Sequence, residues 1–283
     1  MFEELELGVG QSRLRYARGP EHGPPALLLH GVFRRWQDFT PLFPHLVPRW
    51  QVHAMDFRGH GGSGWGGGYR VPDYVEDAVT LLRSMPGEPV VLYGHSLGAM
   101  VACGAAAAAP DRVRAVLLED PPFETLGRGI QSTSFYQQFL GMRGALQRSG
   151  ADVDALTREL AEVRITTASG STRLGDLRDV TQLRFTASCL VRIDPAVFDP
   201  LLAGEWLDGF DVESVLRGVR CPALLLAADG AAGGMMPSEL VDRVDRLLPY
   251  SFRVDLRGIP HNAHWTDPQG IAKLAAGFLE SLR

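Results

Sequence analysis

The sequence predicts an α/β fold, in which a mostly parallel central sheet is flanked by helices on both faces. Short apolar runs of strand type recur along the chain, and stretches with helical spacing lie between them. Several of these runs are continuously apolar, which is typical of strands that are buried on both faces of a sheet. Such sheets place their sites at the carboxyl ends of the strands.

The apolar runs give the order of the expected strands. Residues 3–18 alternate polar and apolar side chains around Gly8-Val9-Gly10, which indicates an opening hairpin. Buried strands are expected in 25–31, 50–56, 89–93, 113–120, 221–228 and 251–256. Helices are expected at 72–85, directly after Ser96, at 237–248 and at 268–282.

The pattern changes between residues 121 and 205. Strand-type runs disappear there, and segments such as 134–147 and 151–165 show helical spacing. The sequence therefore predicts a core formed by 1–120 and 206–283, with a helical insertion over 121–205.

Composition excludes several classes of partner. The net charge of −5 comes without a basic tract, so neither nucleic acid nor an anionic membrane surface is an expected partner. The glycine-rich loop 58–64 lacks the Gly-Lys-Ser/Thr ending of a nucleotide loop. Cys103, Cys189 and Cys221 are odd in number and lack C-x-x-C spacing, which argues against a disulfide framework or a zinc site. No cofactor or metal is expected.

The N-terminus is acidic, and no apolar run reaches membrane-spanning length. A cytoplasmic location is the expectation that follows.

The motif Gly94-His95-Ser96-Leu97-Gly98 lies between an apolar run and a helix of small residues. This context predicts strand, sharp turn and helix, with Ser96 at the apex of the turn. The two glycines suit the close approach of backbone segments at such a turn. The turn exposes a hydroxyl at a helix start, where free N–H groups favour developing negative charge.

Together with His30-Gly31, the run from Asp56 to Gly61 and the late His261, this motif resembles the α/β-hydrolase family. The resemblance spans nearly the whole core and implies an α/β-hydrolase fold with a helical cap inserted after the sixth strand. It also implies a serine nucleophile at Ser96 with a histidine base and an orienting acid. The insertion 121–205 carries no recognised motif.

His261 is the expected base. In the family the base lies on a loop after the last strand, seven residues before a proline that opens the final helix, and His261 and Pro268 have that spacing. The alternative is His264, and either histidine could instead be a structural loop residue.

The acid has two candidates, Asp120 and Asp229. The family most often places it after the seventh strand, three residues beyond a glycine, but Ala228 and Ala231 stand at those positions here. Asp229 lies in that loop, two residues early. Asp120 follows the sixth strand and is narrowly preferred. Some family members, including fungal hydrolases of the macrolactone zearalenone, resemble this layout in placing an acid at that point. Glu119 precedes Asp120 and should point to the other face of the strand.

The tetrahedral intermediate of acyl transfer needs hydrogen-bond donors for its oxyanion. The backbone N–H groups of Leu97, after the nucleophile, and Val32, after His30-Gly31, are the expected donors.

A serine at this turn argues against the dehalogenases and epoxide hydrolases of the fold, which carry aspartate there. The expected activity is hydrolysis of a carboxylic ester or lactone through an acyl-enzyme on Ser96. The alternatives are hydrolysis of a carbon–carbon bond with the same residues, or a non-catalytic relative that binds a ligand. The expected partner is a small, mainly apolar ester or lactone. The sequence leaves open whether the protein forms a homo-oligomer.

Overall fold

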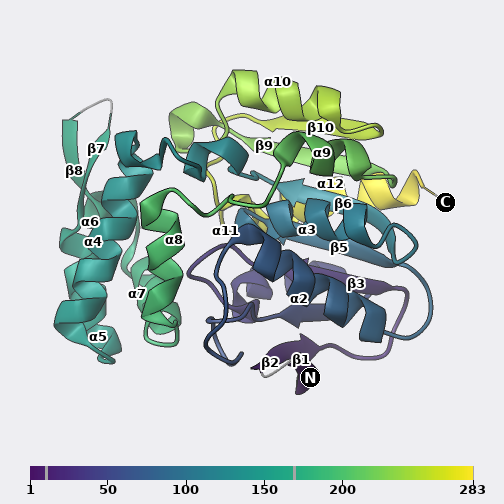
Figure 1. The fold of residues 1–283 in the computed structure, drawn as a ribbon, viewed down its shortest axis with the longest axis horizontal. Coiled ribbons are helices and arrows are strands. Elements are labelled where there is room, and N and C mark those ends of the chain that lie inside the picture. The colour runs from purple at the N-terminus through teal and green to yellow at the C-terminus, as the bar shows by residue number, and fades with distance from the viewer. Residues whose placement is uncertain (10–11, 168–169, 283) are drawn as a thin grey trace.

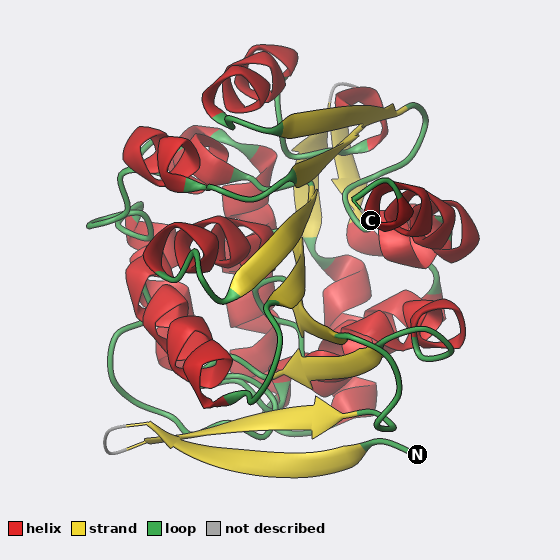
Figure 2. Ribbon diagram, turned by 90° about the vertical axis from the view of Figure 1, so that its right-hand side faces the viewer, coloured by secondary structure: helices red, strands yellow, loops and turns green. Residues whose placement is uncertain are grey.

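The computed structural model describes residues 1–9, 12–167 and 170–282, and its centre is an eight-stranded sheet between two layers of helices (Figure 1, Figure 2). The predicted fold class is therefore confirmed. The strands lie in the order β1-β2-β4-β3-β5-β6-β9-β10. Their bounds are β1 Glu3–Val9, β2 Ser12–Arg18, β3 Pro25–Leu29, β4 Gln51–Met55, β5 Val90–His95, β6 Val113–Glu119, β9 Ala223–Ala228 and β10 Ser251–Leu256.

Strand pairing is antiparallel from β1 to β2 and from β2 to β4, and parallel from β4 across to β10. The middle strands are buried on both faces of the sheet. Successive side chains of a strand point to opposite faces, and helices cover each face. Leu27 and Leu29 belong to the hydrophobic cluster on one face, and Leu28 belongs to the cluster on the other. Because both faces of these strands are buried, their sequences are continuously apolar.

Helices cover both faces of the sheet (Figure 2). One cluster contains buried side chains of α2 Val71–Ser84, α3 Leu97–Ala108, α9 Val212–Gly218 and α10 Ser238–Leu247. The opposite cluster contains side chains of the 3-10 helix η1 Trp36–Leu42, α1 Phe43–Leu46, α11 Ala263–Thr266 and α12 Pro268–Glu280. Short 3-10 segments also occur at η2 Phe123–Leu126, η3 Ile130–Ser132, η4 Pro195–Val197 and η5 Gly230–Ala232.

Helices α4 to α8 lie to one side of the sheet, on the left in Figure 1. Their bounds are α4 Ser134–Ser149, α5 Val153–Glu162, α6 Leu174–Leu177, α7 Val180–Leu190 and α8 Phe198–Ala203. All of them fall within the predicted insertion 121–205.

The insertion also contains strands, which corrects the expectation of an all-helical segment. Helix α5 ends at Glu162, and β7 Arg164–Thr167 pairs with β8 Gly170–Arg173 in an antiparallel hairpin. The run Ile165-Thr166-Thr167 is β-branched, which favours extended backbone over helix. The backbone N–H of Thr166 also donates to Gln137 Oε1 of α4 at 2.7 Å, so tertiary contact supports the strand.

All three cysteines are free and buried, in agreement with the expectation that they form no disulfide framework. Within the described ranges, no helix is both long enough and apolar enough to cross a membrane.

The turn at Ser96 depends on very close packing between α3 and the end of β3. A Cβ atom added at Gly98 would lie 1.8 Å from the carbonyl oxygen of Leu29, and one added at Gly94 would lie 2.2 Å from that of Gly98. Both neighbours are backbone atoms, which cannot rotate away. Glycine is therefore required at both positions by space alone.

We expect Gly98→Ala to lower the free energy of unfolding by about 3 kcal/mol or more, because the added methyl overlaps a backbone carbonyl. Gly277→Ala is the matched control: Gly277 is also helical, in α12, and a Cβ there meets nothing within 4 Å. The control should be neutral or stabilising by up to about 1 kcal/mol. Urea unfolding of both variants measures the difference. Equal stability of the two variants would contradict this account of the turn.

Candidate active site

Ser96 stands at a sharp turn between β5 and α3. Its backbone φ is +55°, which is strained for a residue with a side chain. The turn is held by the N–H of Ser96, which donates to the Glu119 carbonyl at 2.9 Å, and by the N–H of Ala99, which donates to the Ser96 carbonyl at 3.0 Å. The residue is only 3% exposed, yet its hydroxyl oxygen is not sealed from solvent.

The backbone beside this hydroxyl offers two unused donors. In the described part of the chain, neither Val32 N–H nor Leu97 N–H makes a hydrogen bond. Leu97 is the first residue of α3, where a helix has no internal partner for its N–H groups. The N–H groups of Phe33 and Arg34, by contrast, are used: they donate to His60 Nε2 at 3.2 Å and to the Gly31 carbonyl at 3.2 Å.

Two buried histidines hold the loop that carries Val32. His60 Nε2 accepts from Phe33 N–H, and His60 Nδ1 donates to the Arg58 carbonyl at 2.9 Å. His30 Nε2 accepts from Phe57 N–H at 3.2 Å. Burial lowers the pKa of His30 to about 4 and that of His60 to about 3. Both rings are therefore neutral near pH 7, which leaves each with one nitrogen able to accept a hydrogen bond.

His261 lies against the end of β5 and contacts Asp120. Its Nδ1 is 2.6 Å from Asp120 Oδ2. His95, the neighbour of Ser96, bonds through Nε2 to the His261 carbonyl at 3.1 Å, and the two rings are 4.6 Å apart. Among the described residues the Ser96 hydroxyl has no hydrogen-bond partner, so no bond joins it to His261 in this structure. Contacts of this kind often tighten only when substrate is bound.

Asp120 is completely buried and is oriented by the backbone around it. Its Oδ2 also accepts from Met235 N–H at 2.8 Å, and its Oδ1 accepts from Ala228 N–H at 3.4 Å. The residue has a positive φ of +44°, which aspartate tolerates better than most side chains. These contacts direct the carboxylate toward the histidine loop.

Asp229, the other candidate acid, faces a different turn. Its Oδ2 accepts from Gly258 N–H at 2.8 Å and its Oδ1 accepts from Ala231 N–H at 2.9 Å. These bonds, led by the one from Gly258, lower the pKa of the Asp229 carboxyl. The structure therefore brings Asp120, and not Asp229, to His261.

His264 lies behind this site and is fully buried. Its Nδ1 is 2.8 Å from Glu119 Oε1, and Glu119 also accepts from the hydroxyl of Tyr93. Glu119 and Asp120 therefore serve different histidines, in agreement with the expectation that Glu119 points to the other face of its strand. Burial opposes the charge of His264, but the carboxylates of Glu119 and Asp38 outweigh it and raise its pKa to about 9.

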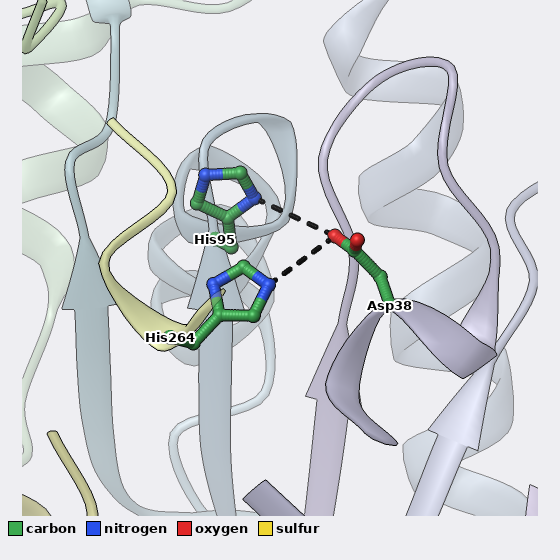
Figure 3. Close-up of side chains that lie close together, drawn as sticks. All are labelled: Asp38, His95 and His264. Carbon is green, nitrogen blue, oxygen red and sulfur yellow. Dashed lines mark ion pairs between the residues drawn. The ribbon is translucent and has the colours of Figure 1, made fainter. Parts of the chain in front are cut away.

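Asp38, His95 and His264 form a buried cluster in which both imidazoles face one carboxylate (Figure 3). Asp38 Oδ2 is 3.4 Å from His264 Nε2 and 3.9 Å from His95 Nδ1, and none of these three atoms has a hydrogen-bond partner among the residues that the structure describes. Two histidines and a carboxylate are a donor set that zinc accepts. However, the His264 imidazolium already lies between two carboxylates, so the cluster needs no cation for charge balance.

Asp38 was not predicted from the sequence. It lies in η1, far along the chain from both histidines, and only folding brings these residues together. Its Oδ1 accepts from Trp265 Nε1 at 2.9 Å. No motif in the sequence marks such a pairing.

The His264 contacts predict a loss of stability at alkaline pH. A histidine whose pKa rises from about 6.5 when unfolded to about 9 when folded contributes stability fully below pH 6.5, and that stability is lost as the pH rises through 9. We expect the free energy of unfolding to fall by on the order of 2–3 kcal/mol between pH 6.5 and 9.5. Urea unfolding across this range measures the fall.

In His264→Gln this fall should be absent, whereas His45→Gln, which changes an exposed histidine, should retain it. If His264→Gln showed the same fall as the unmodified chain, the proton on His264 would not be its cause.

Comparison with known proteins gives several relatives. The chain is 41% identical over 127 residues to the 2-(acetamidomethylene)succinate hydrolase of Mesorhizobium japonicum, a match that covers 44% of this chain and 45% of that protein. The chain thus spans less than half the length of this relative. It is also 31% identical over 242 residues to the pimeloyl-[acyl-carrier protein] methyl ester esterase of Xanthomonas oryzae pv. oryzae, covering 85% of this chain and 88% of the esterase.

Among solved structures, the enol-lactonase from Burkholderia xenovorans LB400 matches with a TM-score of 0.74 and 18% identity, over 98% of this chain and 100% of that one. At this identity the likeness shows a shared fold.

The model of the "alpha/beta hydrolase fold" family matches residues 24–268, which include the Ser96 turn, both candidate acids and His261. The chain belongs to the alpha/beta hydrolase fold family.

Proposed function

We propose that this protein hydrolyses a carboxylic ester or lactone, with Ser96 as nucleophile, His261 as base and Asp120 as the orienting acid. The observation that carries the proposal is the 2.6 Å contact between His261 Nδ1 and the buried Asp120 carboxylate, beside the strained turn of Ser96. A serine hydroxyl needs a base that removes its proton and a group that orients that base.

Each residue has a defined role in this reaction. Asp120 accepts a hydrogen bond from the Nδ1–H of His261, which keeps the proton on Nδ1 and leaves Nε2 unprotonated and able to take the proton of the Ser96 hydroxyl. The serine oxygen then attacks the carbonyl carbon, and His261 returns the proton to the leaving alcohol. Water, deprotonated by the same nitrogen, then attacks the acyl carbon, and the bond to Ser96 breaks as His261 returns that proton to the serine oxygen.

The unused N–H groups of Val32 and Leu97 are the proposed donors to the oxyanion. They are free in the described structure, and both are fixed before substrate arrives, by the histidine-supported loop and by the start of α3. Donors held in place in advance stabilise developing charge without a reorganisation cost.

The proposed substrate is a small molecule with an ester or lactone bond. Two similar proteins are a methyl ester esterase and an enol-lactonase, which supports hydrolysis of an ester-type bond. The insertion 121–205 is proposed to act as the cap over the site, because its helices stand beside the sheet (Figure 1).

Ser96→Ala should reduce the turnover of p-nitrophenyl esters and of a lactone panel by at least about 10³-fold, because it removes the attacking oxygen. A fluorophosphonate probe should label the unmodified protein at Ser96 and leave the variant unlabelled, as read by mass spectrometry. Circular dichroism checks that both are folded.

Absence of an adduct on Ser96 in the folded, unmodified protein would favour a ligand-binding role over catalysis. Turnover confined to ring-cleavage ketoacids would instead replace ester hydrolysis by carbon–carbon bond hydrolysis.

Asp120→Asn and Asp229→Asn distinguish the two candidate acids. Asp120→Asn should lower kcat by about 10³- to 10⁴-fold, because an amide no longer fixes the Nδ1 proton of His261. Asp229→Asn should change kcat less than about threefold, since the amide oxygen still accepts a hydrogen bond at that turn. Steady-state kinetics on one ester measures both. Retention of most activity by Asp120→Asn would remove Asp120 from the mechanism.

A further inference from the structure

A small cavity lies between helix α7 of the insertion and the two loops of the proposed active site. Its volume is about 20 Å³, enough for one or two water molecules. Six residues line it: Arg34, Arg178, Gln182, Phe185, Asn262 and Trp265. Two of them are arginines, and none is acidic.

Two of the lining residues lie close in sequence to residues of the proposed reaction centre. Arg34 is two residues beyond Val32, on the loop proposed to supply an oxyanion donor, and Asn262 directly follows His261. A group held in the cavity by a substrate would thus lie close to both loops.

Arg178 carries a charge that nothing in the described chain neutralises. Its side chain makes no ion pair or hydrogen bond with another described residue, although it is half-buried at the cavity wall. Asp179, the next residue, accepts from Gln182 N–H at 2.9 Å at the start of α7 and so is already engaged. Burial, with the nearby charge of Arg34, lowers the pKa of Arg178 to about 10, so it remains charged at neutral pH.

Arg34 is only partly neutralised. Its Nη1 donates to Thr186 Oγ1 at 3.0 Å, and its Nε is 3.7 Å from Asp38 Oδ1. Its guanidinium also lies over the ring of Phe185, 5.6 Å from the centroid. These contacts hold the Arg34 side chain in one place, so its charge and that of Arg178 face a common space.

The other four lining residues are two amides and two aromatic side chains. Within the described residues, the side-chain amides of Gln182 and Asn262 have no hydrogen-bond partner. Phe185 and Trp265 pack together with ring centroids 5.1 Å apart. Among the described lining residues, two half-buried cations and two free amides without an acid form a setting for a small anion, and arginine matches a carboxylate in geometry as well as charge.

We propose that this cavity binds a carboxylate group of the substrate, so that the substrate is an ester or lactone carrying a free carboxylate at its acyl end. The inference rests on the proposed function for the chemical step and adds the group that positions the substrate. Arg178 is its specificity-determining residue, and Arg34 assists. Binding the carboxylate neutralises the enclosed charge and fixes the reacting carbonyl relative to Ser96.

Matched pairs of substrates test this inference. The p-nitrophenyl half-esters of succinate, glutarate and adipate carry a free carboxylate, and their methyl-capped diesters are neutral and close in size. We expect kcat/KM to be about 10- to 100-fold higher for the half-ester than for the diester at the preferred chain length, mainly through KM. In Arg178→Gln this ratio should fall to within about threefold of unity.

Arg158→Gln is the control, because Arg158 is an exposed arginine of α5 away from the cavity, and it should leave the ratio unchanged. A ratio near unity in the unmodified protein across all three chain lengths, or a ratio unaffected by Arg178→Gln, would overturn the inference while leaving ester hydrolysis intact.

Calorimetric titration with glutarate separates this inference from the catalytic proposal. Glutarate should bind the unmodified protein and Ser96→Ala alike, and Arg178→Gln should weaken binding about 10-fold or more. If no ester were hydrolysed but this binding pattern held, the catalytic proposal alone would fail. Equal binding of glutarate to Arg178→Gln and to the unmodified protein would defeat the carboxylate site.

Discussion

The close approach of helix α3 to the end of strand β3 is the constraint on which the site depends. Gly98 lies so near the Leu29 carbonyl that any side chain would overlap it. This contact places the first turn of α3, which carries the Leu97 N–H, beside the end of β3. Gly31 continues the same packing, since a Cβ there would lie 3.3 Å from Ser96 Cβ. The strained backbone of Ser96 is held by this surrounding structure, as strained residues at functional sites generally are.

Two neighbouring acids at the end of strand β6 contact different histidines. Glu119, the last residue of the strand, turns to His264 in the interior, and Asp120, with its positive φ, turns to His261 at the proposed site. The first pair is completely buried and charged, so it acts as a rigid support behind the second. His95 connects the two, because its ring packs on both histidines. The support and the proposed catalytic pair therefore share one strand end.

Charge is balanced differently on the two sides of this arrangement. Behind the site, the His264 imidazolium lies between Glu119 and Asp38, and the attraction of these carboxylates offsets the cost of burying its charge. Burial and the neighbouring carboxylates act in opposite directions on the pKa of His264, and the carboxylates prevail. Beside the site, Arg178 has no such partner among the described residues. A half-buried cation without a counter-ion is favoured when a ligand supplies the opposite charge, and this imbalance distinguishes the cavity from the ordinary surface of the protein.

Local pattern was sufficient to predict most of the fold. Apolar runs and their spacing placed the strands of the sheet and the main helices of the core, because burial on two faces demands continuous apolar side chains and packing against a sheet demands helical periodicity. The motif around Ser96 likewise predicted the turn, since its glycines answer a local steric need. The β7–β8 hairpin was missed, because β-branched residues at the end of a helical pattern take their conformation from the contact with Gln137.

The sequence alone also did not decide which acid contacts which histidine. Asp120 and Asp229 follow neighbouring strands, and the sequence favoured Asp120 only narrowly. The tertiary structure shows that Met235 N–H and Ala228 N–H orient Asp120 toward His261, while Gly258 N–H engages Asp229. Strand order tells which side chains reach the same edge of the sheet. Which of them meet is decided by hydrogen bonds from backbone N–H groups to the carboxylates, and those to Asp120 come from residues more than a hundred positions along the chain.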